Sequence, residues 1–475
     1  MGVAPQPGLK RSIGLATVVS TSAGLTFASS TFLVVVQMAC SLAGDAAWIA
    51  IGIAGGLCAL AAAAFSELNG MWPSVNGIRL YLYQAFGEKL SLVAALSYMS
   101  VVTLVVGTEA SVLSHVLSDA LPAIKPPWWI FLMLTLATAV NFRGLKIAGT
   151  FQNVLTCSVV ASIVTLSILA LSHAHHIPAP THTGGIGPLF SAVGVAVFLF
   201  VGFEWVTPLA DEVKSPRAIP TGMFIAVVLL AVVYALTATA MFTGLVPRSL
   251  LLLSPSGGRQ PIPHVVFALQ VLGPAGRWVM IGTSLCMSLT TFNAGLMGVS
   301  RFLYGMARDK VLPASLSSLS VRFSTPDRAV LVVYAAALAV SALVYWTQRF
   351  VLLVNLAAAT EAFIYALAAA AVIVLRRKDP ARPRPFQMRG GLWLPALTVL
   401  VFTALGVGVF VQPNPESWGA GLLLVAVVLG WGAYLHFFAL PRLVKLRAAA
   451  AARPSRRPPR QAPKSSPDAE EPNTP

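Results

Sequence analysis

Apolar stretches long enough to cross a lipid bilayer recur along almost the whole chain. Of its 475 residues, 57% are hydrophobic and only 10% are charged. About 20 consecutive apolar residues suffice for a transmembrane helix, and a helix satisfies its own backbone hydrogen bonds inside a bilayer. We therefore predict an all-α integral membrane protein with twelve transmembrane helices, at residues 13–39, 46–65, 90–117, 128–140, 151–171, 186–210, 221–245, 278–304, 329–345, 350–375, 392–411 and 418–439.

Basic residues are distributed unevenly between the predicted loops. With the N-terminus placed in the cytoplasm, most of the 32 Lys and Arg residues fall in cytoplasmic segments, as the positive-inside rule requires. The short stretch at 128–140 could be re-entrant, but the basic residues at 376–378 would then lie outside, so we count it as a span. The distribution predicts a multi-pass protein of the plasma (cell inner) membrane with cytoplasmic N- and C-termini. It also argues against nucleic acid as the reason for the net charge of +16.

The predicted span at residues 186–210 contains residues that interrupt a helix. Residues 198–220 read FLFVGFEWVTPLADEVKSPRAIP, with Gly202, Glu204 and Pro208 inside an apolar run. A carboxylate near the middle of a bilayer costs about 2.5–3.5 kcal/mol on insertion scales, so it is kept mainly where it faces a cavity or a partner. This pattern predicts a broken transmembrane helix at a site for a polar solute.

The first predicted span carries a second interruption, at residues 20–24. Its sequence there, STSAG, is small and hydrogen-bonding where a plain membrane anchor would have Leu and Ile. Each of these two spans opens a group of five, and paired interruptions at corresponding positions indicate a midplane binding site in a secondary transporter. An unwound helix offers N–H groups at one end and C=O groups at the other, which a zwitterion satisfies together. The alternative is that the small residues serve close helix packing.

Four stretches of the sequence resemble motifs of the amino acid-polyamine-organocation (APC) superfamily of amino acid permeases. FVGFEWVTPLADEVKSPRAIP is similar to its span 6 motif, F-x-G-F-E followed by E-V-K-N-P and I-P. NAGLMGVSRFLYGMARDKVLP is similar to the end of span 8. AFSELNGMWPSVNGIRLYLYQAFG and NFRGLKIAGTFQNVLT are similar to the connection between spans 2 and 3 and to the beginning of span 5. The resemblance covers most of residues 10–390.

This resemblance implies a leucine-transporter-like fold, in which two inverted five-helix repeats are followed by two extra helices. The expected segments are a cytoplasmic N-terminus (1–10), a first repeat (11–185), a second, inverted repeat (186–378), two additional transmembrane helices (379–441) and a disordered, basic, Pro-rich cytoplasmic tail (442–475). Basic residues next to the last span would attract anionic lipid, at about 1 kcal/mol each near the surface. Membrane lipid is therefore an expected partner, and a tail that only enforces topology is the alternative.

The resemblance also implies a substrate site made largely of backbone groups. The expected contacts are Ser20, Ala23, Gly24, Phe198, Val201 and Gly202. The substrate carboxylate would meet the amides of Ala23 and Gly24, and its ammonium group the carbonyls of Ser20 and of the span 6 residues. Phe198 lies where such transporters often have an aromatic outer gate.

Departures from the family pattern qualify these expectations. The usual G-x-G-I-F of span 1 has Ser22 in place of its first Gly and Thr26 in place of its Phe. Many proton-coupled relatives have a Lys in span 5 that mimics a bound sodium ion, and this chain has Val159 there. A lysine-based coupling mechanism is therefore not expected.

Ionisable and hydroxyl side chains inside the predicted spans are the candidates for ion coupling. Burial favours the protonated form of a carboxyl group, so Glu204, Glu109 and Glu361 are the candidate proton sites, with a hydrogen-bonded structural role as the alternative. Thr290 and Thr291 could instead hold sodium together with span 1 carbonyls, although hydroxyls in a span more often bond to their own backbone.

Charged residues near the span ends are expected to be structural. Arg301 is expected to extend to the cytoplasmic surface and not to touch substrate. Asp211, Glu212 and Lys214 at the inner end of span 6 are expected to be interface charges.

We therefore expect a secondary active transporter that moves amino acids across the plasma membrane by alternating access, coupled to protons or working by exchange. A neutral amino acid is the favoured substrate. The alternatives are an amino acid exporter, a cationic amino acid or amine transporter, a transporter-like sensor and a membrane enzyme. We expect no enzymatic activity and no cofactor. We also expect no metal site, because the outer cluster of His173, His175, His176 and His182 lies in a Pro-containing loop without fixed geometry.

Overall fold

Helices make up the regular structure of the part of the chain that the structure describes. The computed structural model describes residues 9–28, 36–173, 186–242, 263–411 and 415–451. Ten helices in these ranges are long and apolar enough to cross a membrane, and α1 (Leu15–Thr26) and α7 (Pro126–Phe142) are shorter apolar helices. The all-α membrane class is therefore confirmed, whereas the count of twelve spans and the inverted repeat stay predictions.

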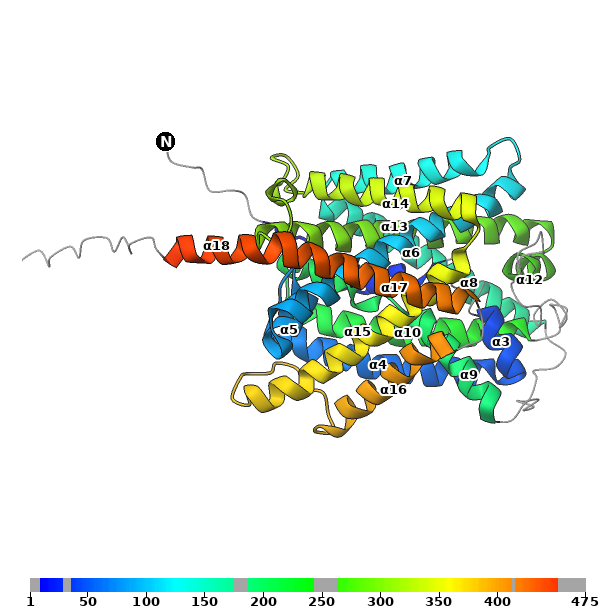
Figure 1. Ribbon diagram of the computed structural model, residues 1–475. Coiled ribbons are helices and arrows are strands. Elements are labelled where there is room, and N and C mark those ends of the chain that lie inside the picture. The colour runs from blue at the N-terminus through cyan, green and yellow to red at the C-terminus, as the bar shows by residue number, and fades with distance from the viewer. Residues whose placement is uncertain (1–8, 29–35, 174–185, 243–262, 412–414, 452–475) are drawn as a thin grey trace, which may run out of the picture.

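The helices pack into a bundle whose longest members run in roughly the same direction (Figure 1). Helices α3 and α12 lie at one end of the bundle, and α5 and α18 lie at the other. After α1, the chain forms α3 (Gln37–Ala43), η2 (Gly44–Ala46), α4 (Ala47–Met71), α5 (Gly77–Phe86), α6 (Glu88–Ala120), α7, α8 (Leu145–Ser172), α9 (Ile186–Val197), η3 (Phe198–Phe200), η4 (Phe203–Glu212) and α10 (Ala218–Met241). It continues with α12 (Pro263–Leu272), α13 (Pro274–Arg308), η5 (Ala314–Ser317), α14 (Asp327–Thr347), α15 (Phe350–Lys378), α16 (Trp393–Val411), α17 (Pro415–Tyr434), the π-helical turn η6 (Leu435–Ala439) and α18 (Leu440–Ala451).

Small side chains allow α4 to pack closely against its neighbours. The alanines at positions 61–64 are buried, and α4 packs against α10, α9 and α15. Because lipid tails are as apolar as leucine, helices in a membrane associate through close packing and not through a hydrophobic force between them. The alanine-rich sequence of α4 therefore brings the broken span and α15 around one shared helix.

A buried ion-pair cluster fastens the segment between α15 and α16 to the end of α4. Glu67 is fully buried and pairs with Arg376 Nη2 at 2.6 Å and with Arg384 Nε at 3.3 Å. The backbone N–H of Met388 also donates to Glu67 Oε2, at 2.9 Å. Two guanidinium groups and an amide thus compensate one desolvated carboxylate, as a buried charge requires.

The expectation that Arg301 reaches the cytoplasmic surface is wrong. Its side chain is fully buried, and its Nε lies 3.2 Å from Glu212 Oε2. The face of α13 that carries Arg301 packs against η4, so the guanidinium group meets a carboxylate before it reaches water. Glu212 is therefore a buried ion-pair partner and not an interface charge, whereas the neighbouring Asp211 forms a more exposed pair with Arg308 at 3.7 Å.

Part of the segment expected to be disordered is helical. Helix α18 runs to Ala451, so residues 442–451 are helical. The sequence RLVKLRAAAA consists mainly of strong helix formers, and alanine has the highest helix propensity of all residues. The rest of the expected tail, 452–475, lies outside the described residues, as do His175, His176 and His182 of the histidine cluster.

Candidate functional site

The predicted interruption of the sixth span is confirmed. Helix α9 ends at Val197, the tighter 3-10 turn η3 follows, and the chain turns at Gly202 with a φ of +106° before η4 begins. Glycine adopts this left-handed region without a Cβ penalty, and a Cβ at Gly202 would lie 2.9 Å from Leu25 Cδ2. The span therefore breaks at Val201 and Gly202, with backbone groups released from the α-helical ladder.

The first span is interrupted further along the chain than predicted. Residues 20–24 are helical, and α1 ends at Thr26, where Phe27 N and Thr26 Oγ1 both donate to Ala23 O. The small residues serve packing at this point, since a Cβ at Gly24 would lie 1.8 Å from Gln152 Nε2. The packing alternative therefore explains residues 20–24, and the helix instead ends just before residues 29–35, which lie outside the described ranges.

The span 1 groups expected to bind substrate are already engaged. Ser20 O accepts hydrogen bonds from Gln152 Nε2 at 3.0 Å and from Thr156 Oγ1 at 3.2 Å. The amides of Ala23 and Gly24 lie within the last turns of α1, where each backbone N–H donates to the carbonyl group four residues earlier. Their role in binding a carboxylate stays a prediction, and it would require this end of α1 to unwind.

The two threonines expected as sodium ligands lie beside the end of α1. Thr290 Oγ1 donates to Gly24 O at 3.0 Å, and Thr291 Oγ1 donates to the same oxygen at 3.3 Å. Both hydroxyls also bond to Met287 O within their own helix. Bonding to their own backbone is the alternative to sodium binding that the sequence left open. Sodium binding here stays a prediction.

A network of buried amides that the sequence reasoning missed also contacts α1. Asn293 Nδ2 donates to Gln152 Oε1 at 2.8 Å, and Asn141 Nδ2 donates to Asn293 Oδ1 at 2.8 Å. Since Gln152 also bonds to Ser20 O, buried amides join α1, α7, α8 and α13. The signal was present, because Asn141 and Gln152 both belong to the NFRGLKIAGTFQNVLT motif.

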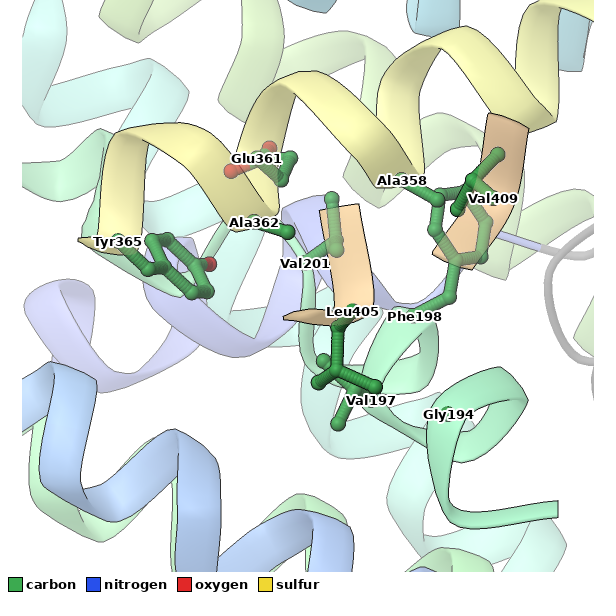
Figure 2. Close-up of a pocket in the computed structure, with 10 residues that line it drawn as sticks. All are labelled: Gly194, Val197, Phe198, Val201, Ala358, Glu361, Ala362, Tyr365, Leu405 and Val409. Atoms are coloured by element: carbon green, nitrogen blue, oxygen red, sulfur yellow. The ribbon is translucent and has the colours of Figure 1, made fainter. Parts of the chain in front are cut away.

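A small cavity lies where the sixth span breaks, between the break, α15 and α16 (Figure 2). Its volume is about 30 Å³, which is room for only one or two water molecules. Figure 2 shows Phe198, Ala358 and Val409 at one end of the cavity and Tyr365 at the other. The lining is otherwise aliphatic, apart from Glu361, and consists of Gly194, Val197, Phe198, Val201, Ala358, Glu361, Ala362, Tyr365, Leu405 and Val409.

Phe198 and Val201 thus line a cavity, as two of the six predicted substrate-contact residues. The contribution of α16 was not predicted, because the sequence resemblance to known motifs ends before it. Leu405 and Val409 of α16 complete the apolar wall. Tyr365 was also missed, although its position one helical turn after Glu361 places both side chains on the same face of α15.

Two of the three predicted proton sites come together beside this cavity. Glu204 and Glu361 are both buried, and their carboxyl groups lie within hydrogen-bonding reach of each other. The Tyr365 hydroxyl donates to Glu204 Oε2 at 2.7 Å, and the Tyr98 hydroxyl donates to Glu361 Oε2 at 2.5 Å. The sequence indicated each carboxylate separately but not their pairing.

The third predicted proton site, Glu109, has a different environment. It is buried on α6, and the hydroxyl of Ser288 on α13 donates a hydrogen bond to its Oε1. Within the described ranges, no group of three or more His, Cys, Asp or Glu side chains has the arrangement that a metal ion requires. His173, the described member of the histidine cluster, bonds to the backbone carbonyl of Leu169 through its Nδ1 at 2.7 Å.

Comparison with known proteins agrees with this architecture. A family model described as "Amino acid permease" matches residues 9–434. The branched-chain amino acid permease BcaP of Bacillus subtilis is 26% identical over 431 residues, which cover 85% of this chain and 89% of that protein. The mouse Asc-type amino acid transporter 1 is 28% identical, with 78% of this chain and 71% of that protein covered. The vacuolar cationic amino acid transporter 4 of Arabidopsis thaliana is 27% identical, with 70% and 58% covered. Because the family model spans most of its length, this chain belongs to the amino acid permease family.

Proposed function

We propose that this protein is a secondary active transporter that moves neutral, aliphatic amino acids across the plasma membrane by alternating access. The observation that carries the proposal is the cavity at the break of the sixth span, with its aliphatic lining and its single carboxylate, Glu361. An aliphatic side chain is favoured there because burying apolar surface contributes about 25 cal/mol per Å². The similarity to a branched-chain amino acid permease supports the same class of substrate.

The α-amino group of the substrate binds at the broken span in this proposal. The C-terminal ends of α9 and η3 direct carbonyl groups toward the break, and carbonyl groups at a helix end attract a cation. Val201 and Phe198 belong both to this break and to the cavity wall. Glu361 adds negative charge on the opposite side, from α15.

The cavity is smaller than an amino acid in this conformation, so binding requires the elements around it to separate. The inner end of the sixth span is held closed by backbone hydrogen bonds, in which Ser12 N and Ile13 N donate to Glu212 O and Lys214 N donates to Ile13 O. Alternating access in this proposal releases these contacts when the site opens toward the cytoplasm.

The twelve-span architecture with two inverted repeats and cytoplasmic termini forms part of the proposal. Coupling to a proton is favoured over coupling to sodium and over simple exchange.

A cationic amino acid is the second candidate substrate. It is favoured by Glu361, a carboxylate in the cavity wall, and by the similarity to a transporter named as cationic. We rank it second because the Tyr98 hydroxyl and the second carboxyl group already occupy hydrogen-bonding positions around Glu361.

Transport by purified protein in proteoliposomes tests the proposed function. Uptake of labelled leucine, alanine and lysine is measured separately under three conditions. These are an imposed proton gradient, an imposed sodium gradient, and the same unlabelled amino acid inside the vesicles for exchange. We expect saturable leucine exchange that valine and isoleucine compete with more strongly than lysine. Flux of lysine but not leucine would favour the cationic alternative, and no flux of any amino acid would contradict the transporter function.

A further inference from the structure

The carboxyl groups of Glu204 and Glu361 approach each other from two elements that are far apart in the sequence. We propose that these two residues form a single proton site, holding one proton between them, and that this shared proton is the coupling ion. The inference rests on the transport function proposed above. It differs from the expectation of separate candidate carboxylates, because neither residue alone would bind the coupling proton.

Burial and hydrogen bonding define the site. Glu204 has 0% and Glu361 2% of its surface exposed. Each accepts one hydrogen bond from a tyrosine hydroxyl, Glu204 from Tyr365 and Glu361 from Tyr98. Glu204 Oε1 is buried and has no hydrogen-bond partner among the described residues. A proton on one of the two carboxyl groups allows that group to donate a hydrogen bond to the other, which two ionised carboxylates cannot do because they only accept.

The surroundings provide no positive charge to hold two carboxylates together. The titratable groups that face the pair are Tyr98 on α6, Cys58 on α4 and Tyr365 on α15, and all three are neutral at physiological pH. No described Lys, Arg or His forms an ion pair with either carboxylate. Two like charges in contact in a desolvated site cannot both stay ionised, so one proton is retained between them.

Aromatic rings hold the tyrosine donor in place. The Tyr365 ring lies 5.4 Å from Phe203, 5.8 Å from Phe65 and 5.2 Å from Phe402, measured between ring centroids. Each contact is tilted or edge-on, which are the favoured aromatic geometries. The phenol of Tyr365 is thereby fixed between η4, α4 and α16 with its hydroxyl directed at Glu204.

The position of the pair links the proton to the opening of the cavity. Glu204 lies in the first turn of η4, two residues after the turn at Gly202, and Glu361 lies in the cavity wall on α15. With one proton bound, a carboxylic acid donates to a carboxylate and the pair, with net charge −1, joins η4 to α15. Release of that proton to water leaves a charge of −2 and replaces the hydrogen bond with repulsion. The broken span then separates from α15, which opens the cavity between Val201 and Ala362.

The test compares Glu204→Gln, Glu361→Gln and the double variant in proteoliposomes, with Glu109→Gln as the control. Glu109 is equally buried, and it accepts a hydrogen bond from the hydroxyl of Ser288 on α13. Two quantities are measured for each protein: leucine exchange without a gradient, and leucine accumulation driven by an imposed proton gradient. A glutamine at either position still donates a hydrogen bond to the remaining carboxylate, so the contact persists without a titrating proton.

We expect each single variant to lose proton-driven accumulation as completely as the double variant, while Glu109→Gln retains it. Two independent sites would instead give partial losses that combine in the double variant, which would overturn the inference. Wild-type exchange without any proton-driven accumulation would also overturn it, leaving the transport function intact. Absence of leucine exchange in the wild type would instead contradict the proposed function itself.

A second measurement does not depend on transport. Infrared difference spectra between neutral and alkaline pH report protonated carboxyl groups in the purified proteins. We expect a protonated-carboxyl signal in the wild type and in Glu109→Gln that is lost in both Glu204→Gln and Glu361→Gln, because a carboxylate beside an amide needs no proton. Persistence of that signal in either single variant would overturn the shared site. Thermal unfolding of each variant establishes that it is folded.

Discussion

The hydroxyl of Tyr365 on α15 donates a 2.7 Å hydrogen bond to Glu204 on η4, directly after the break in the sixth span. The same hydroxyl accepts a longer hydrogen bond, 3.4 Å, from the backbone N–H of Gly202. One phenol therefore contacts both the turn that breaks the helix and the carboxyl group that follows it. This relationship fixes the broken span against the helix that carries Glu361.

Removing this hydroxyl should destabilise the protein. Tyr365→Phe leaves a buried carboxyl group without its phenol donor, at a cost of about 1–3 kcal/mol in the free energy of unfolding. Thermal unfolding in detergent measures the change. The control is Tyr334→Phe, because the Tyr334 hydroxyl bonds to Thr135 Oγ1 at 2.8 Å at a half-buried position away from the cavity. An equal loss in both variants would show that Tyr365 has no special part in holding the break.

A side chain at Gly202 should disturb the break itself. Gly202→Ala places a Cβ in the left-handed region and 2.9 Å from Leu25 Cδ2, so the turn must shift away from the end of α1. We expect lower stability and a large loss of leucine exchange. Gly56→Ala on α4 is the matched control, since a Cβ there meets nothing within 4 Å and alanine favours a helix by up to about 1 kcal/mol over glycine. Normal exchange by Gly202→Ala would contradict a role for this turn.

The buried pair between Arg301 and Glu212 should be required for stable packing of η4 against α13. Arg301→Met leaves an uncompensated buried carboxylate, which costs about 3–5 kcal/mol. The double variant Arg301→Met with Glu212→Gln should recover most of that loss. Arg308→Ala is the comparison, because its pair with Asp211 is 3.7 Å long and partly exposed and such pairs contribute about 0–1 kcal/mol. Failure of the double variant to recover would mean that packing, and not charge, decides the effect.

A buried histidine outside the candidate spans should make the stability depend on pH. His264 on α12 is buried, its Nε2 lies 3.2 Å from Ser284 Oγ, and burial lowers its pKa from 6.5 to about 4. Between these values the unfolded chain binds a proton at this histidine and the folded protein does not. Unfolding is therefore increasingly favoured as the pH falls from about 6.5 toward 4. The fall in unfolding temperature between pH 7 and pH 5 should be smaller in His264→Gln, and an identical fall would contradict the assignment.

The features that could be predicted from the sequence depend only on residues that are close together in it. Gly202 and Pro208 weaken a helix and Glu204 is costly in an apolar one, whatever that helix packs against, so the break in the sixth span could be located in advance. Small residues are less informative, because they suit both an unwound helix and a close helix contact. Residues 20–24 prove to be helical, since Gly24 packs against Gln152 of α8.

The features that could not be predicted depend on which helices become neighbours. Arg301 was expected to reach water because the sequence gives its position near a span end but not the presence of Glu212 opposite. Glu204 and Glu361 each stood out as costly carboxylates, but no local pattern shows that η4 and α15 meet. The amides of Asn141, Gln152 and Asn293 likewise acquire a role only when α7, α8 and α13 are brought together.

Leucine binding to a protein whose cavity has been filled tests the location of the site most directly. Ala362 lines the cavity and is buried, whereas Ala335 is an exposed residue of α14. Ala362→Leu and Ala335→Leu therefore make the same change inside and outside the proposed site. We predict saturable binding of labelled leucine to the wild type and to Ala335→Leu, and no saturable binding to folded Ala362→Leu. Binding by Ala362→Leu with wild-type affinity would contradict the placement of the substrate at the break of the sixth span.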